Sequence, residues 1–226
     1  MAKSFFSFTD EQNNPASPNH AIFPIFCHRN GETVLLGTGF YISSAGIFVT
    51  AKHIFEDEIP PFFSINFLND NEYMIRGINK IISKEQLALS NYEPSEGELL
   101  STYAFPHTLV NKDIDTDTTN VKVIANNIHG TVIQSEPKGF GIVKGKVLVA
   151  DMTNKGGSSG GPVFTPSAKG VIGLNSSGSD SNYFVISLIS QIRDLVIDGV
   201  CFQNKTNDLK IVTIDELIKL GYIKVI

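Results

Sequence analysis

Residues 156–162 read Gly-Gly-Ser-Ser-Gly-Gly-Pro and stand between runs of apolar residues. Glycines let the backbone turn tightly enough for nearby N–H groups, here those of Gly157 and Ser159, to point at one place. Donors converging in this way stabilise a developing oxyanion. Pro162-Val163-Phe164 then returns to a strand pattern. The segment therefore predicts a sharp turn between short strands that presents the Ser159 hydroxyl.

A serine hydroxyl is a weak nucleophile until a neighbouring base, most often histidine, removes its proton. His53 is the candidate base, because residues 46–50 predict a strand that runs into a short turn just before it. Each segment also has an ordinary interpretation, residues 156–162 as a flexible Gly/Ser loop and His53 as a half-buried histidine at a strand end. A phosphate-binding loop is a poor match, because Lys155 precedes the glycines instead of following them. The presence of both segments in one chain favours a nucleophilic site.

Both segments resemble motifs of the trypsin-like (chymotrypsin-fold) serine peptidases, most closely those of the HtrA-like bacterial branch. Residues 50–53 are similar to the family's TAxH motif and residues 157–162 to its GxSGGP motif, in the family's chain order. The resemblance extends over about residues 21–196. Its weaker matches follow the same order: Gly37-Thr38-Gly39-Phe40, Leu87-Ala88-Leu89, Tyr103-Ala104-Phe105-Pro106 at the end of the first barrel, Gly130-Thr131-Val132, Asp151 and Gly170-Val171-Ile172-Gly173-Leu174-Asn175.

The resemblance implies an all-β, chymotrypsin-like fold of two six-stranded antiparallel β-barrels with a C-terminal helix and a short extra helical tail. Many short Val/Ile/Phe-rich runs separated by Gly and Pro agree with this class. The length of 226 residues suffices for one peptidase domain with a sizeable core. We expect an N-terminal arm at 1–20, a peptidase domain at 21–198 with barrels at about 21–110 and 120–186 and a helix at 187–197, and an extension packed on the domain at 199–226.

Three local signals support particular elements. An Asn-Gly pair at residues 30–31, between two apolar runs, predicts a hairpin turn. Apolar residues within 187–197 recur at helical spacing. Thr213 and Glu216 form a capping-box pattern, which predicts a short helix that ends before Gly221.

The resemblance also implies catalytic roles. Ser159 attacks the scissile carbonyl, His53 acts as general base and then general acid, and the N–H groups of Gly157 and Ser159 form the oxyanion hole. Where the family has an aspartate before Leu-Ala-Leu, this chain has Gln86, which accepts the Nδ1–H bond of His53 without adding charge. Glu85 is the acidic alternative, although a slip by one residue turns its side chain to the opposite face of the strand.

Substrate contacts follow from the same resemblance. Leu174 and Asn175 pair with the substrate backbone as an added strand. Thr153 lies at the base of the specificity pocket, with Ser177 and Gly178 on its wall. Because none of these side chains is acidic, we expect a small-to-medium apolar or polar substrate side chain rather than arginine or lysine.

Composition restricts the partners. A net charge of −5 provides no basic surface for nucleic acid. No stretch approaches the ~20 apolar residues of a membrane span, and no signal-peptide pattern begins the sequence, so we expect a soluble, cytoplasmic protein. Cys27 and Cys201 are the two cysteines and lack metal-ligand spacing. We expect them to be partly buried thiols, with a disulfide as the alternative, and we expect no metal or cofactor.

The sequence therefore predicts a serine endopeptidase that acts on a protein or peptide, with its activity lowered by Gln86. One alternative is a pseudopeptidase, the same fold kept as a peptide-binding module after loss of the full triad. Retention of Ser159, His53 and the glycine pattern argues against that alternative, because a binding module does not require them. A third interpretation is an unrelated β-barrel binding protein with a fortuitous Gly/Ser loop.

Overall fold

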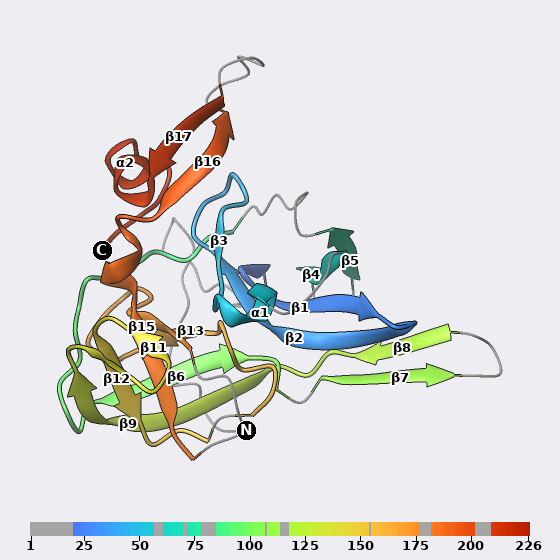
Figure 1. Ribbon diagram of the computed structural model, residues 1–226, viewed down its shortest axis with the longest axis horizontal. Helices are drawn as coiled ribbons and strands as arrows, with labels where there is room; N and C mark the ends of the chain where they lie inside the picture. Colours follow the sequence, from blue (N-terminus) through green and yellow to red (C-terminus); the bar gives the residue numbers. More distant parts are fainter. Residues whose placement is uncertain are drawn as a thin grey trace.

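The computed structural model describes residues 20–56, 61–69, 72–77, 85–106, 108–113, 118–153, 155–176, 182–201 and 209–226. Nearly all of the regular structure in this part is β, as predicted (Figure 1). Its α-helices are α1 (His53–Glu56) and α2 (Ile214–Lys219). Neither has the length and apolar character that a membrane-crossing helix needs.

The N-terminal half forms a five-stranded antiparallel sheet with strand order β3-β2-β1-β4-β5. The first six residues of β1 are buried, which fits their run of Ile, Phe and Cys side chains. Arg29 pairs with Glu32 across the β1–β2 turn, which confirms the Asn-Gly hairpin. A six-stranded first barrel stays a prediction, because the described residues form a sheet. The strands are β1 (Ile22–Arg29), β2 (Glu32–Tyr41), β3 (Phe48–Val49), β4 (Phe62–Asn69) and β5 (Glu72–Gly77).

The second half contains a closed six-stranded barrel with strand order β12-β15-β14-β13-β6-β9. Alternate residues of its strands point inward, as Phe184, Ile186 and Leu188 do along β15, and they fill the interior. The predicted second barrel is thus confirmed. Its strands are β6 (Leu99–Ala104), β9 (Asn126–Glu136), β12 (Val147–Ala150), β13 (Pro162–Phe164), β14 (Gly173–Asn175) and β15 (Phe184–Leu188).

The boundary between the halves lies earlier than the sequence suggested. The segment Tyr103-Ala104-Phe105-Pro106 was expected at the end of the first barrel. Its first two residues end β6 instead, and β6 pairs with β9 and β13 of the closed barrel. The barrel therefore begins at Leu99 instead of about residue 120. The strand pattern of β6 is local, whereas its membership of a sheet depends on the distant partners β9 and β13.

The prediction of a helix over residues 187–197 was wrong. The chain instead continues β15 to Leu188, makes a 3₁₀ helix at Ile189–Ile192 and enters β16 (Val196–Cys201). Because β15 hydrogen-bonds to both β12 and β14, its extended backbone completes the barrel, and this outweighs helical spacing. Leu195 and Val196, expected on the buried face of that helix, are 58% and 61% exposed.

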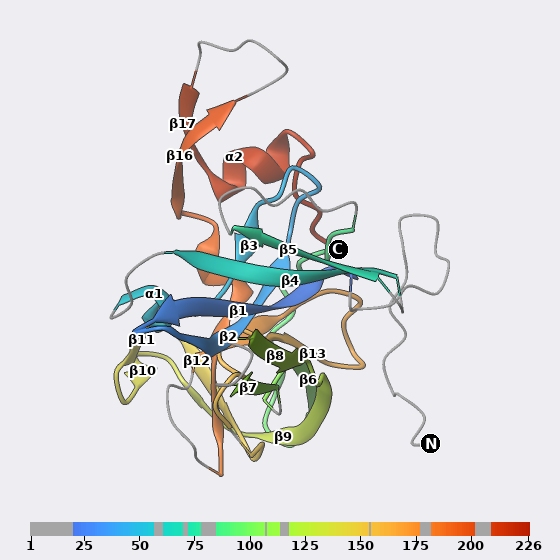
Figure 2. The ribbon, with the colours of Figure 1, turned by 90° about the vertical axis from the view of Figure 1, so that its right-hand side faces the viewer.

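Smaller hairpins flank these sheets. In Figure 1, β7 and β8 extend sideways from the end of β6, whereas β16, β17 and α2 lie at the upper end of the molecule. Figure 2 shows the sheet of β1, β2 and β4 between that upper end and β9. The hairpins pair β7 (Leu109–Asp113) with β8 (Thr118–Lys122), β10 (Gly139–Phe140) with β11 (Val143–Lys144), and β16 with β17 (Leu209–Thr213).

The C-terminal extension packs on both halves. Its helix α2 starts at the predicted capping box, in which the Thr213 hydroxyl accepts from the Glu216 N–H and the Glu216 carboxylate accepts from the Thr213 N–H. Beyond the helix, the N–H of Leu89 donates to the Lys224 carbonyl and the N–H of Ile226 donates to the Leu89 carbonyl. The chain end thus holds the connector between the halves.

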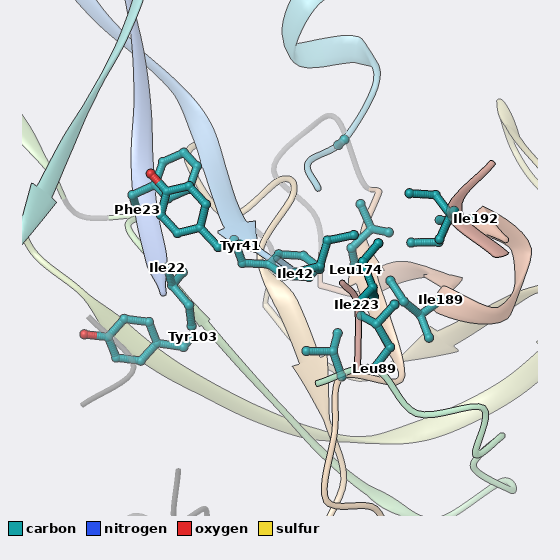
Figure 3. Close-up of a cluster of buried hydrophobic side chains, with 14 of the residues drawn as sticks. Ile22, Phe23, Tyr41, Ile42, Leu89, Tyr103, Leu174, Ile189, Ile192 and Ile223 are labelled. Atoms are coloured by element: carbon teal, nitrogen blue, oxygen red, sulfur yellow. The ribbon is translucent and has the colours of Figure 1, made fainter. Parts of the chain in front are cut away.

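A large apolar cluster joins the sheet, the barrel and the extension. Figure 3 shows side chains of β1 and β2 gathered with those of the barrel and the extension. Fully burying one such aliphatic or aromatic side chain stabilises a fold by about 1.5–3 kcal/mol, so the cluster holds the two halves in a fixed relation. Its labelled members are Ile22, Phe23, Tyr41, Ile42, Leu89, Tyr103, Leu174, Ile189, Ile192 and Ile223.

Candidate active site

Ser159 lies on a tight turn directly before β13 and is 7% exposed. Gly157 and Gly160 have φ of +92° and +83°, in the left-handed region that side chains disfavour. A Cβ on Gly157 would also lie 2.6 Å from Leu35 Cδ2 and 2.9 Å from the Phe105 carbonyl oxygen. The turn that the glycine-rich sequence predicted is therefore formed, and both glycines are required by conformation and space.

Backbone hydrogen bonds hold this turn against the barrel. The N–H of Gly160 donates to the carbonyl of Asn175 (2.8 Å), and the N–H of Asn175 donates to the carbonyl of Gly161 (3.0 Å). Within the turn, the Gly161 N–H donates to the Ser158 carbonyl at 3.0 Å. Ser159 is thus placed by a rigid barrel strand rather than by a flexible loop, which contradicts the flexible-loop interpretation.

His53 begins α1, directly after β3 and the turn that the sequence predicted. The next residue, Ile54, is buried in the cluster between the halves and anchors the helix. On the exposed side of α1, Lys52 Nζ pairs with Glu56 Oε1 at 2.5 Å. The His53 ring itself is half-buried.

The turns that carry His53 and Ser159 pack against each other. A Cβ on Gly160 would overlap the Thr38 carbonyl oxygen and the Thr50 hydroxyl, and it would lie 2.9 Å from the Ala51 nitrogen. A Cβ on Gly37 would likewise overlap the Ile54 side chain and lie 2.7 Å from the Ser159 carbonyl oxygen. The chain from Thr50 to Ile54 therefore lies directly on the serine turn, although it comes from the other half of the molecule.

Burial lowers the pKa of His53, while the nearby Glu56 carboxylate raises it by stabilising the imidazolium. The net shift is downward, so the ring is neutral and able to accept a proton at pH 7. Among the residues described, Glu56 is the carboxylate that acts on this ring. The sequence motifs did not point to Glu56, because they place the family's acidic residue next to Leu87-Ala88-Leu89.

We expect the midpoint of the His53 ring titration, followed by NMR, to lie below pH 6.5, the ordinary histidine value, because burial lowers the pKa. Glu56→Gln removes the charge that favours the imidazolium, so the midpoint should move to lower pH. Glu93→Gln, which alters a distant pair with Lys146, is the control and should leave it unchanged. A midpoint that rises in Glu56→Gln would show that this carboxylate does not act on His53.

Gln86 and Glu85 are both engaged with other groups. Gln86 Oε1 accepts from the backbone N–H of Ser44 at 2.8 Å, and Glu85 Oε1 lies 2.9 Å from Nδ1 of His20. The N–H of Leu87 donates to the Tyr41 carbonyl at 2.8 Å, so this segment runs beside the end of β2. Contact of Gln86 with the Nδ1 side of His53 stays a prediction.

The expected substrate pairing at Leu174 and Asn175 does not fit the barrel. Strand β14 lies between β13 and β15, and Leu174 pairs with Pro162 on one side and Ser187 on the other. The Asn175 N–H and carbonyl bond the serine turn, as described above. An added strand needs unpaired backbone groups, which a strand inside a closed barrel lacks. Of the pocket residues, Thr153 is exposed, whereas Ser177 and Gly178 lie outside the described residues.

Ser158 is fully buried, and its hydroxyl has no hydrogen-bond partner within the described protein. A buried hydroxyl without a partner costs about 1–3 kcal/mol of desolvation. We therefore expect Ser158→Ala to leave the free energy of unfolding unchanged or to raise it by up to about 1 kcal/mol.

Chemical denaturation measures this change. The matched control is Ser43→Ala, because Ser43 is also fully buried but its hydroxyl accepts from the Ala45 N–H at 3.2 Å. That variant should lose about 1 kcal/mol. A loss in Ser158→Ala as large as that in Ser43→Ala would mean that the Ser158 hydroxyl is satisfied.

Two of the remaining sequence expectations concern single side chains. Cys27 is a buried thiol in β1, and Cys201 is the last residue of β16. Asp151, matched to the HtrA-like group, is exposed and accepts from the Thr131 hydroxyl at 3.0 Å. Asp151 therefore fixes the end of β12 relative to β9.

Comparison with known proteins identifies the fold. The sequence matches no family model and none of the curated proteins. Rv3671c protease from M. tuberculosis in its active form superposes with 12% identity over 77% of this chain and 78% of that chain, with a TM-score of 0.52. Deg5 gives 12% identity over 77% and 86%, with a TM-score of 0.56. The HtrA-type protease AlgW with a decapeptide gives 10% over 86% and 75%, with 0.52.

These structural neighbours are HtrA-type trypsin-like serine proteases, as the sequence motifs predicted. Identities of 10–12% show a shared fold and no more. In this chain itself, a serine turn and a histidine turn pack together at the junction of the two halves.

Proposed function

We propose that this protein is a serine endopeptidase of the trypsin-like type, in which the N-terminal sheet corresponds to the family's first barrel. The observation that carries the proposal is the packing of the histidine turn on the serine turn around Gly160. Two motifs separated by more than a hundred residues meet at one point, in the fold that serine proteases use. The interpretation of residues 156–162 as a fortuitous Gly/Ser loop does not explain why the histidine turn packs on them.

The proposed reaction proceeds through an acyl-enzyme. Ser159 Oγ attacks the substrate carbonyl carbon while His53 Nε2 takes the hydroxyl proton. The oxyanion that forms accepts hydrogen bonds from the N–H groups of Gly157 and Ser159. His53 then gives the proton to the leaving amine, and a water molecule repeats the sequence to release the acid. The lowered pKa of His53 suits this role, because a neutral imidazole is available at pH 7.

Support for His53 comes from two groups in this proposal. Gln86 orients the ring from the Nδ1 side, and the Glu56 charge stabilises the imidazolium from within α1. Neither supplies the buried carboxylate of a full triad, so turnover is slow relative to an enzyme that has one. In a serine protease with a full Ser-His-Asp triad, replacing the aspartate by its amide lowers kcat by about 10⁴.

A protein or peptide is the proposed substrate, and AlgW, which has this fold, is known with a decapeptide. Backbone pairing with the substrate would begin after Asn175, where the chain leaves β14. Thr153, which is exposed beside the buried Met152, stays the proposed residue at the base of the specificity pocket.

Labelling with a fluorophosphonate probe tests this function, because the probe reacts only with an activated serine. Mass spectrometry of the labelled peptide should place the adduct on Ser159. Ser159→Ala should abolish labelling, and Ser158→Ala, the neighbouring hydroxyl, should retain it. Failure of the wild-type protein to label, together with no cleavage of a peptide library, would reject the enzyme.

A pseudopeptidase is the second candidate, and one observation favours it. The acceptor oxygen of Gln86 already receives the Ser44 N–H, so this residue is a weak orienter of a histidine. A binding module of this kind would hold peptides with equal affinity in the wild type and in Ser159→Ala, and neither would turn them over. Fluorescence anisotropy with labelled peptides separates this outcome from catalysis.

A further inference from the structure

Thr38 lies in β2 between two glycines and is fully buried. Its backbone N–H donates to the Ser159 carbonyl at 2.8 Å. Its hydroxyl donates to the Gly157 carbonyl, also at 2.8 Å. One residue of the N-terminal sheet therefore holds the carbonyls of both residues whose N–H groups are the proposed oxyanion donors.

Holding these carbonyls restricts the N–H groups. The Gly157 carbonyl is in one planar peptide unit with the Ser158 N–H, and the Ser159 carbonyl is in one with the Gly160 N–H, so the bonds from Thr38 fix these two units. The unit that carries the Ser159 N–H lies between them, and the unit that carries the Gly157 N–H adjoins the first through φ and ψ of Gly157. Gly157 needs such a restraint more than other residues, because glycine has the widest choice of backbone conformations. The hydroxyl of Thr38 is thus placed where it selects one orientation of the Gly157 peptide.

The same residue also bonds the histidine side of the site. The Thr50 hydroxyl donates to the Thr38 carbonyl at 2.6 Å, and Thr50 stands three residues before His53. The Phe105 N–H donates to the Thr38 hydroxyl at 3.4 Å, which ties it to the end of β6. All three polar groups of Thr38 are therefore used between the two turns and the barrel.

We propose that Thr38 is a positioning residue that sets the oxyanion hole against the histidine turn, acting through its hydroxyl on Gly157 and its backbone on Ser159 and Thr50. The proposal rests on the proposed peptidase function. It concerns no atom of the substrate. A polar residue at this place is needed because an aliphatic side chain leaves the Gly157 carbonyl and the Phe105 N–H buried without partners.

Three variants isolate the hydroxyl. Thr38→Val keeps the branched shape and removes the hydroxyl, and Thr38→Ser keeps the hydroxyl and removes the methyl group. The matched control is Thr102→Val, because Thr102 is also fully buried and its hydroxyl donates to the Pro162 carbonyl at 2.8 Å. It loses the same kind of bond close to the site without touching the carbonyls of Gly157 or Ser159.

Kinetics on a cleaved peptide give the first measurement. We expect Thr38→Val to lower kcat by about 10- to 100-fold, since displacing a catalytic group by 1 Å costs about this much, with KM within about threefold of wild type. Thr38→Ser should recover most of kcat, and Thr102→Val should stay within about threefold. An equal loss in Thr102→Val, or no recovery in Thr38→Ser, would overturn the proposal in favour of general destabilisation.

Amide hydrogen exchange of Ser158, measured by NMR, gives a second test that needs no catalysis, because this N–H shares the peptide unit of the Gly157 carbonyl and donates to the Lys155 carbonyl at 3.0 Å. Exchange at this amide should be about tenfold faster in Thr38→Val, which frees that peptide unit from one hydrogen bond, and unchanged in Thr102→Val. If the wild type neither labels nor cleaves, the proposed function fails, and exchange still decides the role of Thr38. Unchanged exchange would overturn it. If Thr38→Val does not fold, Thr50→Val is the substitute variant. Thr50 is half-buried, and this change removes the hydrogen bond that its hydroxyl donates to the Thr38 carbonyl. The same pattern of kinetics and exchange is expected.

Discussion

Ser159→Ala is expected to lower kcat by between about 10² and 10⁶. The upper figure is the effect of removing the nucleophile from a full triad, and the lower one allows for the about 10⁴ that a neutral third member costs. Gln86→Ala should lower kcat by less, because position 86 aligns the base whereas Ser159 forms the covalent bond. Gln86→Asp should raise kcat, since a carboxylate stabilises the imidazolium, provided that the shorter side chain reaches His53.

The measurement is kcat/KM for the wild type and these three variants over a peptide library. Glu85→Gln is the control for position 86, because Glu85 pairs with His20 and its loss should leave kcat/KM unchanged. A fall in Glu85→Gln larger than that in Gln86→Ala would show that Glu85 is the third member. Wild-type hydrolysis equal to that of Ser159→Ala would favour the peptide-binding alternative.

Gly160→Ala is expected to lower the free energy of unfolding by about 2–5 kcal/mol, which combines the cost of a left-handed backbone with that of overpacking. Its φ of +83° disfavours a side chain, and a Cβ there would overlap the Thr38 carbonyl oxygen and the Thr50 hydroxyl. The turns that carry His53 and Ser159 would have to move apart, so activity should be lost together with stability.

Thermal and urea unfolding measure the loss, with Gly156→Ala as the control. Gly156 belongs to the same segment, but a Cβ on it would meet nothing within 4 Å. Its replacement should change stability by no more than about 0.5 kcal/mol. Equal stability of the two variants would mean that the histidine turn does not pack on Gly160, and the proposed site would lose its main support.

Much of the fold followed from local signals. The Asn-Gly turn and the Thr213–Glu216 capping box depend on neighbouring residues, and both formed as predicted. The helix over 187–197 and the barrel boundary near residue 120 were wrong. In both cases the deciding interactions were hydrogen bonds to distant strands, from β15 to β12 and β14 and from β6 to β9 and β13.

The candidate site divides in the same way. The sequence identified His53, Ser159 and Gly157, because nucleophile, base and tight turn each require particular residue types. It did not identify Thr38, Thr50 or Glu56. Residues 37–40 were only a weak match to a family segment, and the structure alone shows that Thr38 bonds the serine turn.

The sequence by itself determined the chemistry available to this protein: a serine on a glycine turn, a histidine after a short strand and a neutral residue at position 86. Tertiary structure decided what surrounds that chemistry. It placed Glu56 beside His53, engaged Gln86 with Ser44 and paired β14 on both sides within the barrel. The physical reason is the distance in sequence over which each interaction acts. Turns and caps depend on residues close together in the sequence, whereas strand pairing, burial and charge at the site depend on distant segments that only folding brings together.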